Sequence, residues 1–155
     1  QATEHYLASL EIHQKIGNGI GVAISYLNLV EAALGKDDME AAERYAMKGL
    51  DAAQQVRMPK LIAGTYKTLG LIEKRKQAWG KAMKHFQKAA EIADDAGAKP
   101  ELASAYRYIG EVSLELHNIE EAKEFLQRAM VLFEQLKSRQ NVEQVKALLQ
   151  QCERR

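Results

Sequence analysis

The sequence predicts an all-α protein, a solenoid of antiparallel helix pairs, on three observations. Two prolines and ten glycines in 155 residues leave few turn signals, whereas a β-sandwich needs a turn every ~8–12 residues. The chain aligns with itself at an offset of forty residues, and periods of ~20–50 residues are typical of solenoids. Apolar residues recur at helical spacing within each period.

The forty-residue period is clearest at positions that hold small or aromatic residues. These are Ala23, Ala63 and Ala103; Tyr26, Tyr66 and Tyr106; Ala2, Ala42, Ala82 and Ala122; and Tyr6, Ala46, Phe86 and Leu126. The last two sets reach one period further toward the N-terminus than the first two. The apolar spacing inside each period fits two helices. Because the last two sets begin at Ala2 and Tyr6, the chain starts in the second helix of a repeat.

The first element is a helix over about 1–17, which we interpret as the second helix of a truncated repeat covering 1–19. Gly17, Gly19 and Gly21 superficially resemble a phosphate-binding loop, but no strand precedes them. A helix stop followed by a turn is the better interpretation.

Three helix pairs are expected next, over 20–59, 60–99 and 100–139. Pro59 and Pro100 stand near the starts of the second and third pairs, and proline suits the first turn of a helix. Within the pairs, helices are expected at about 20–35 and 39–57, 60–75 and 79–97, and 101–116 and 119–137.

Two further helix starts carry the pattern of a capping box. Asp37 is followed three residues later by Glu40, and Asn118 by Glu121. In this arrangement the first side chain accepts a hydrogen bond from the backbone of the first turn.

The last element, over 140–155, is expected to be a C-terminal capping helix. Its apolar side chains recur at helical spacing, while glutamines and glutamates occupy the other positions; the apolar ones are Val142, Val145, Leu148 and Leu149. One apolar face and one solvated face are typical of a helix that ends a repeat array. We therefore expect one array over 1–155.

The central repeat resembles the tetratricopeptide repeat. The residues that fill the family's pattern are Tyr66, Leu69, Gly70, Ala82, Phe86 and Ala89. Residues 106–129 fill it nearly as well, and residues 26–49 least well. The period is forty residues rather than the usual ~34, so the chain is similar to the longer-helix branch seen in kinesin light chains, G-protein-signalling modulators and bacterial sensor or transcription-activator arrays.

This resemblance implies a right-handed superhelix in which the first helix of each pair lines a concave groove. It also implies a scaffold that binds another protein or a peptide, rather than an enzyme. The first-helix residues that packing within the pairs leaves free are Asn28, Glu31 and Leu34; Lys67, Thr68, Leu71, Lys74 and Arg75; and Arg107, Tyr108, Glu111 and Glu115.

The centre of this groove is expected to be basic, with acidic groups around it. Lys67, Lys74 and Arg107 are predicted to hold an acidic segment of the partner. Leu71 and Tyr108 are expected to be exposed apolar groups among the charges, a common composition for an interface. One subtype of the family clamps a C-terminal carboxylate with a lysine and an asparagine one turn apart. Leu71 follows Lys67 instead, so that clamp is not expected.

Other functional classes find little support. A net charge of +1 gives no electrostatic attraction to nucleic acid or to an anionic membrane. The single cysteine, Cys152, excludes a disulfide framework; we expect it partly buried in a reducing, cytoplasmic protein. The four histidines are scattered, and no catalytic set stands out. We therefore expect no catalytic residue, metal site or cofactor.

One alternative to the scaffold stays open. The array could mediate self-association or transmit a signal inside a larger sensor or transcription-regulator protein. The predicted assembly state is a monomer or a weak homo-oligomer, and a monomer with a free groove favours the scaffold.

Overall fold

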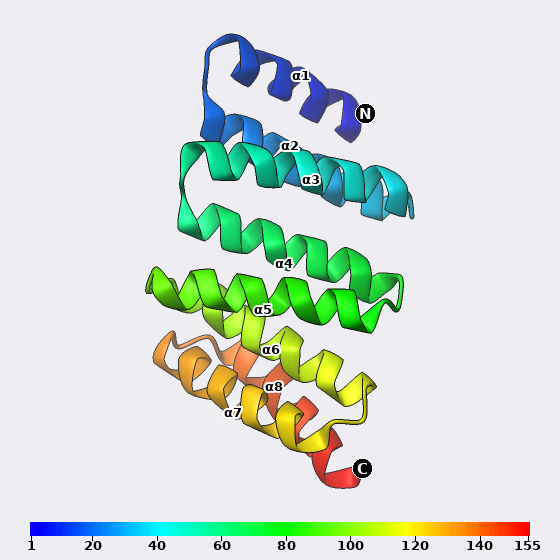
Figure 1. The fold of residues 1–155 in the computed structure, drawn as a ribbon, viewed down its shortest axis with the longest axis vertical. Coiled ribbons are helices and arrows are strands. Elements are labelled where there is room, and N and C mark those ends of the chain that lie inside the picture. Colours follow the sequence, from blue (N-terminus) through cyan, green and yellow to red (C-terminus); the bar gives the residue numbers. More distant parts are fainter.

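The computed structural model describes all 155 residues, and they form eight α-helices without a strand. Successive helix pairs stack along the long axis, with the two termini at its opposite ends (Figure 1). Their bounds are α1 Ala2–Lys15, α2 Gly19–Gly35, α3 Met39–Val56, α4 Pro59–Arg75, α5 Trp79–Asp95, α6 Lys99–Glu115, α7 Ile119–Gln135 and α8 Arg139–Arg154. Each bound lies within two residues of the range expected from the sequence.

The helices join through turns of one kind, spaced twenty residues apart. One residue in each turn has a positive φ: Gly17, Asp37, Arg57, Gln77, Gly97, His117 and Lys137. In six of the seven turns, the next residue donates its N–H to a carbonyl five residues back, as Asp38 does to Ala33 at 2.9 Å. This bond closes the end of the helix. Because the turns recur every twenty residues, the first and second helices are nearly equal in length.

Close approach of the paired helices depends on a small residue opposite a large one. A Cβ added to Gly70 of α4 would lie 2.5 Å from Cε1 of Phe86 in α5, and one on Gly110 of α6 would lie 2.5 Å from Cγ of Leu126 in α7. Phe86 and Leu126 are fully buried. The two glycines therefore let the helix axes approach while the large side chains fill the crossing.

The sequence-based expectations for the helix starts are partly wrong. Asp38, not Asp37, caps α3, because its Oδ1 accepts the N–H of Ala41 at 2.9 Å, whereas Asp37 occupies the left-handed turn position. Asn118 makes no bond to the backbone of α7. Its Nδ2 donates instead to Oε2 of Glu121 at 3.0 Å.

The other turn signals behave as expected. Pro59 is the first residue of α4, and Pro100 lies in the first turn of α6. Gly17 has φ +69° at the end of α1, and Gly21 packs against the ring of His13, so the three glycines form a turn and a close helix contact. None of the eight helices combines the length and apolar composition that a bilayer span requires.

Candidate peptide-binding groove

The groove residues predicted from the sequence all lie on α2, α4 and α6, the first helices of the three pairs. On α4, Lys67, Leu71, Lys74 and Arg75 follow helical spacing and share one side of the helix. All the predicted side chains are partly buried, apart from Glu31, Arg75 and Glu115, which are exposed.

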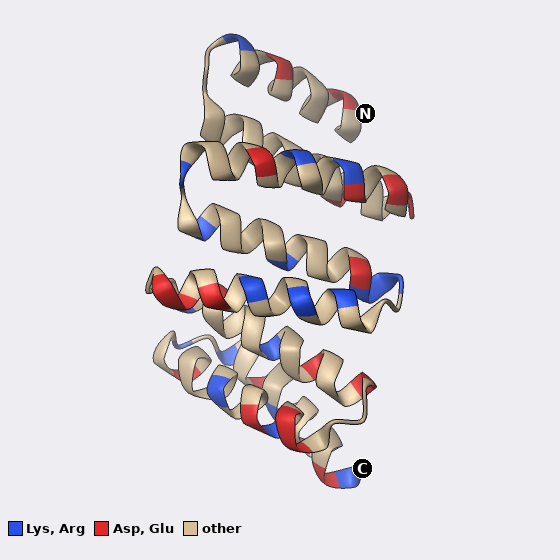
Figure 2. Cartoon of the chain, in the orientation of Figure 1, with Lys and Arg blue, Asp and Glu red and all other residues tan.

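Charge differs between the three helices. Glu31 is the only charged residue of α2. Helix α4 has four cations, Lys60, Lys67, Lys74 and Arg75, against the single carboxylate of Glu73. Helix α6 carries both signs, while charges of both signs are spread along the whole stack (Figure 2). Of the three helices, α4 is therefore the one with a surplus of cations.

A cluster of charges links α4 to α6. The ammonium of Lys74 forms an ion pair with Oε2 of Glu111. Nη1 of Arg107 pairs with Oε1 of the same carboxylate at 2.8 Å. Glu111 thus lies between two of the cations that were expected to hold the partner, and it neutralises part of their charge. The acidic groups are not only around the basic centre but inside it.

Tyr108 lies beneath this cluster. Its ring stacks on Phe86, with 5.0 Å between the ring centroids and 15° between the planes. The guanidinium of Arg107 lies 4.3 Å from the centroid of Tyr108, and the ammonium of Lys74 lies 5.4 Å from it. The expectation that Leu71 and Tyr108 are exposed is therefore wrong, because both pack partly against the core.

Lys67 has different surroundings from Lys74, although both lie on α4. Its ammonium takes part in no ion pair or hydrogen bond. Burial lowers the pKa of Lys67; the carboxylate of Glu101 acts against this, and the charge of Arg107 lowers the pKa further. On α6, two side-chain atoms are buried without a hydrogen-bond partner, Oε2 of Glu101 and Nε of Arg107.

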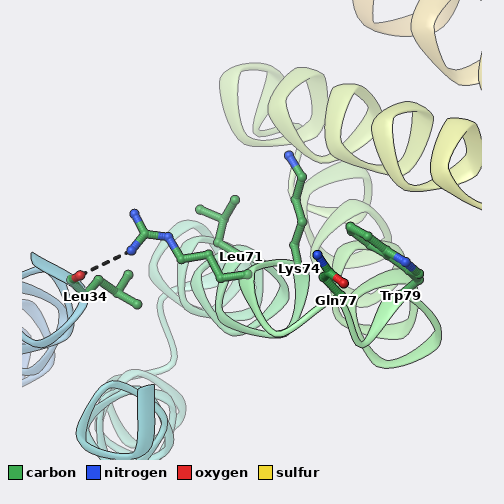
Figure 3. A pocket seen from close by; sticks show the side chains of 6 residues that line it. Leu34, Leu71, Lys74, Gln77 and Trp79 are labelled. Carbon is green, nitrogen blue, oxygen red and sulfur yellow. Dashed lines mark hydrogen bonds between the residues drawn. The ribbon is translucent and has the colours of Figure 1, made fainter. Parts of the chain in front are cut away.

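A cavity of about 350 Å³ opens beside the cluster, between the C-terminal ends of α2 and α4 and the start of α5. Leu34, Leu71 and Trp79 provide its apolar lining, and Lys74 extends from it toward α6 (Figure 3). Nη1 of Arg75 donates to the carbonyl of Leu34 at 3.2 Å, which fixes one wall. The cavity is large enough for one apolar side chain.

Sequence reasoning missed several residues of this region. Ile24 and Leu27 extend the row of Asn28 and Glu31 by one turn of α2, and Ile24 is 46% exposed. Helical spacing could have found both. Trp79 was out of reach, because it belongs to a second helix and enters the cavity only through the turn. Nothing in the sequence marked Glu101 as a residue of this region.

No metal-binding arrangement appears among these residues. The structure brings together no group of three or more His, Cys, Asp or Glu side chains that could hold a metal ion. Cys152 is buried in α8, and this burial raises the pKa of its thiol. The side chains predicted for the groove offer charge, apolar surface and hydrogen bonding.

Comparison with known proteins agrees with this architecture. Residues 61–135 match the model of the tetratricopeptide repeat family. This stretch, just under half of the chain, consists of tetratricopeptide repeats. The match covers the α4–α5 and α6–α7 pairs, where the residues of the repeat pattern stand. No curated protein sequence matches the chain.

Several solved structures share the fold at low sequence identity. BtubC from P. vanneervenii has a TM-score of 0.82 and 21% identity, over 93% of this chain and 61% of that one. Aspartyl phosphate phosphatase F from Bacillus subtilis has a TM-score of 0.89 and 18% identity, over 94% of this chain and 38% of that one. A signal transduction ATPase with a tetratricopeptide repeat sensor from Pyrococcus horikoshii has a TM-score of 0.82 and 18% identity, over 94% of this chain and 23% of that one. The chain spans less than two thirds of each of these structures.

Proposed function

We propose that the chain is a scaffold module that holds a protein or peptide segment in the groove formed by α2, α4 and α6. The observation that carries the proposal is the set of polar and apolar side chains on these three consecutive first helices, with a cavity among them. Of this set, Leu34, Leu71 and Tyr108 also pack partly against the hydrophobic core. The tetratricopeptide fold supports a non-catalytic interaction role.

The surface is suited to a segment of mixed chemistry. Ile24, Leu27 and Leu34 make the α2 wall largely apolar, whereas α4 carries a surplus of cations. An extended or helical segment with apolar side chains toward α2 and an acidic residue toward α4 matches this gradient. Complementary charge contributes mainly to specificity and association rate, so the apolar contacts are needed for affinity.

Gly64 offers a test that does not require the partner's identity. It lies on α4 three residues before Lys67 and four before Thr68, on the same side of the helix, and a Cβ added there meets nothing within 4 Å. A random twelve-residue peptide library displayed on phage would be selected on the wild-type chain. Gly64→Trp is expected to weaken the selected peptides at least tenfold in a fluorescence anisotropy titration, because the indole occupies the groove.

Gly80 provides the matched control. It is exposed on the second helix α5, and a Cβ there also meets nothing within 4 Å. Gly80→Trp adds the same side chain outside the groove and should change affinity less than twofold. Failure to recover any binding peptide, or equal losses for the two variants, would overturn the groove assignment.

A second candidate function is self-association or signal transmission within a larger regulatory protein. The observation that favours it is the apolar end of the array near the α1–α2 turn, where Ile12 and Ile16 are 57% and 68% exposed and Ile20 is exposed as well. Exposed apolar patches mark interaction surfaces. A molar mass that rises with concentration, and returns to the monomer value in Ile16→Lys, would favour this candidate over the scaffold.

A further inference from the structure

The cavity at the ends of α2 and α4 lies where the first helix pair meets the second. Leu34 packs partly against the core cluster that α2 and α3 share with α4, whereas Leu71 and Trp79 pack partly against the cluster of α4, α5 and α6. All three side chains line the cavity of about 350 Å³ (Figure 3). None of them is fully buried, so part of their apolar surface stays open to solvent at this junction.

The next junction of the array, between α4 and α6, carries charged residues at the same repeat positions. Forty residues after Leu34 and Leu71 stand Lys74 and Glu111, and these two side chains form an ion pair with each other. The second junction therefore satisfies its own groups. The first junction has two apolar side chains at these positions and leaves a cavity between them. A ligand that fits the first junction therefore supplies apolar surface, whose transfer out of water is favourable.

The mouth of the cavity carries one cation whose charge has no internal partner. Of the two cations that line the cavity, Lys74 is paired with Glu111. Arg75 is exposed and forms no ion pair, and only its Nη1 is engaged, with the carbonyl of Leu34 at 3.2 Å. A guanidinium has five N–H donors in a planar fork that matches a carboxylate. The remaining donors of Arg75 can therefore bind an acidic group from outside the chain.

We propose that this cavity is the anchor site of the groove. It takes one large apolar side chain of the partner segment, and Arg75 binds the carboxylate of an Asp or Glu within two residues of that side chain. Lys74 takes no part in binding the acid, because Glu111 already binds its ammonium. This inference rests on the proposed groove and adds the chemical class of residue that the groove recognises.

Trp79 is the only tryptophan of the chain, so its fluorescence reports on the cavity. Tryptophan-free peptides selected on the wild-type chain are expected to share one large apolar residue with an acid beside it. At saturation such a peptide should shift the Trp79 emission to shorter wavelength, because the apolar side chain displaces water from the indole. The same peptide with alanine at the anchor should bind at least tenfold more weakly and cause no shift.

Arg75→Gln and Lys60→Gln form a matched pair, since each removes one positive charge from an exposed position of α4, and Lys60 does not line the cavity. Changing the acid of the peptide to its amide should weaken binding to the wild type about fivefold. With Arg75→Gln the same change should cost less than twofold, and with Lys60→Gln the full loss should remain. Circular dichroism of each variant verifies that it is folded.

An unchanged Trp79 emission at saturation overturns the inference. So do selected peptides that lack the shared pair of residues, or an acid that contributes equally in Arg75→Gln and in Lys60→Gln. In each of these cases Gly64→Trp still blocks the peptides, so the proposed groove stands. Recovery of no binding peptide at all overturns the groove and the anchor site together.

Discussion

Lys67 and Lys74 lie two turns apart on the same helix, yet their surroundings make them opposites. Lys74 has an internal partner, Glu111, whereas Lys67 is partly buried without one. Helical periodicity predicted that both lie on one side of the helix. It could not predict that a carboxylate of α6 reaches one and not the other, because contacts between helices depend on rotamers and on helix offset.

This difference predicts stability changes of opposite sign. Lys67→Met removes a poorly solvated charge and keeps the apolar stem, so it should raise the free energy of unfolding by about 0.5–1 kcal/mol. Lys74→Met removes a partner of Glu111 and should lower it by about 1 kcal/mol. Urea unfolding at pH 7 measures both, and changes of the same sign would contradict this account of the two environments.

The pH dependence gives an independent check on Lys67. Its folded-state pKa lies below the usual lysine value, so the folded chain binds this proton less readily than the unfolded chain. The penalty is fully present below the folded pKa and disappears as the pH rises through the ordinary lysine pKa. The stability difference between the wild type and Lys67→Met should therefore shrink in alkaline solution.

Between elements, the three helix pairs solve one packing problem in two ways. Gly70 opposes Phe86, and Gly110 opposes Leu126. At the equivalent positions of the first pair stand Val30 and Ala46, both fully buried. In the first pair the larger side chain therefore stands on the first helix, α2, and the smaller one on the second helix, α3, which reverses the arrangement of the other two pairs. This exchange explains why residues 26–49 resemble the family pattern least well while α2 and α3 still pair in the same way.

The exchange predicts strong coupling between Gly70 and Phe86. Gly70→Val overpacks the crossing, since the new Cβ meets the ring, and should cost about 1–3 kcal/mol. Phe86→Ala leaves a cavity and should cost about 3–5 kcal/mol. The double variant recreates the native pairing of Val30 with Ala46, so its cost should fall more than 1 kcal/mol below the sum.

Chemical denaturation of the wild type, the two single variants and the double variant completes this double-mutant cycle. Gly80→Val is the control, because a Cβ at Gly80 meets nothing and the change should be close to neutral. Simple additivity of the two core substitutions would show that the crossings of the first and second pairs are not interchangeable.

Element bounds were largely predictable from the sequence, whereas the atoms that end each helix were not. Period and spacing locate helices because the apolar stripe must face its neighbour. The capping expectation at Asp37 was one residue off, since Asp37 and Asp38 are both acceptable caps by type. Only the left-handed conformation of Asp37 assigns the cap to Asp38.

Across the whole molecule, the two ends of the stack differ in polarity. Helix α8 occupies the place of a first helix, one period after α6. At the positions where α4 and α6 contact their own second helices, α8 carries exposed polar residues: Glu143, Lys146 and Gln150 replace Ala63, Tyr66 and Gly70. Its other face packs on α7 through Val145 and Cys152. The opposite end, at α1, leaves Ile12 and Ile16 uncovered.

Deletion of residues 139–155 should therefore weaken the array without unfolding it. The cut uncovers Leu114, Ala129 and Phe133, which pack in one cluster with α8, and leaves the contacts among α1 to α5 unchanged. In a nearest-neighbour array only the adjoining pair loses an interface. The circular dichroism signal should fall only by the share of the deleted helix, with a lower unfolding midpoint; loss of all helical signal would exclude such modularity.

The turns that recur every twenty residues also relate the number of repeats to ligand length. Every forty-residue unit begins and ends with the same kind of joint, so whole units add to the stack without a new type of connection. Packed helices lie roughly 8–10 Å apart, and an extended chain advances about 3.3 Å per residue. In the proposed groove, each first helix would therefore cover roughly three residues of an extended segment, and α2, α4 and α6 together about nine.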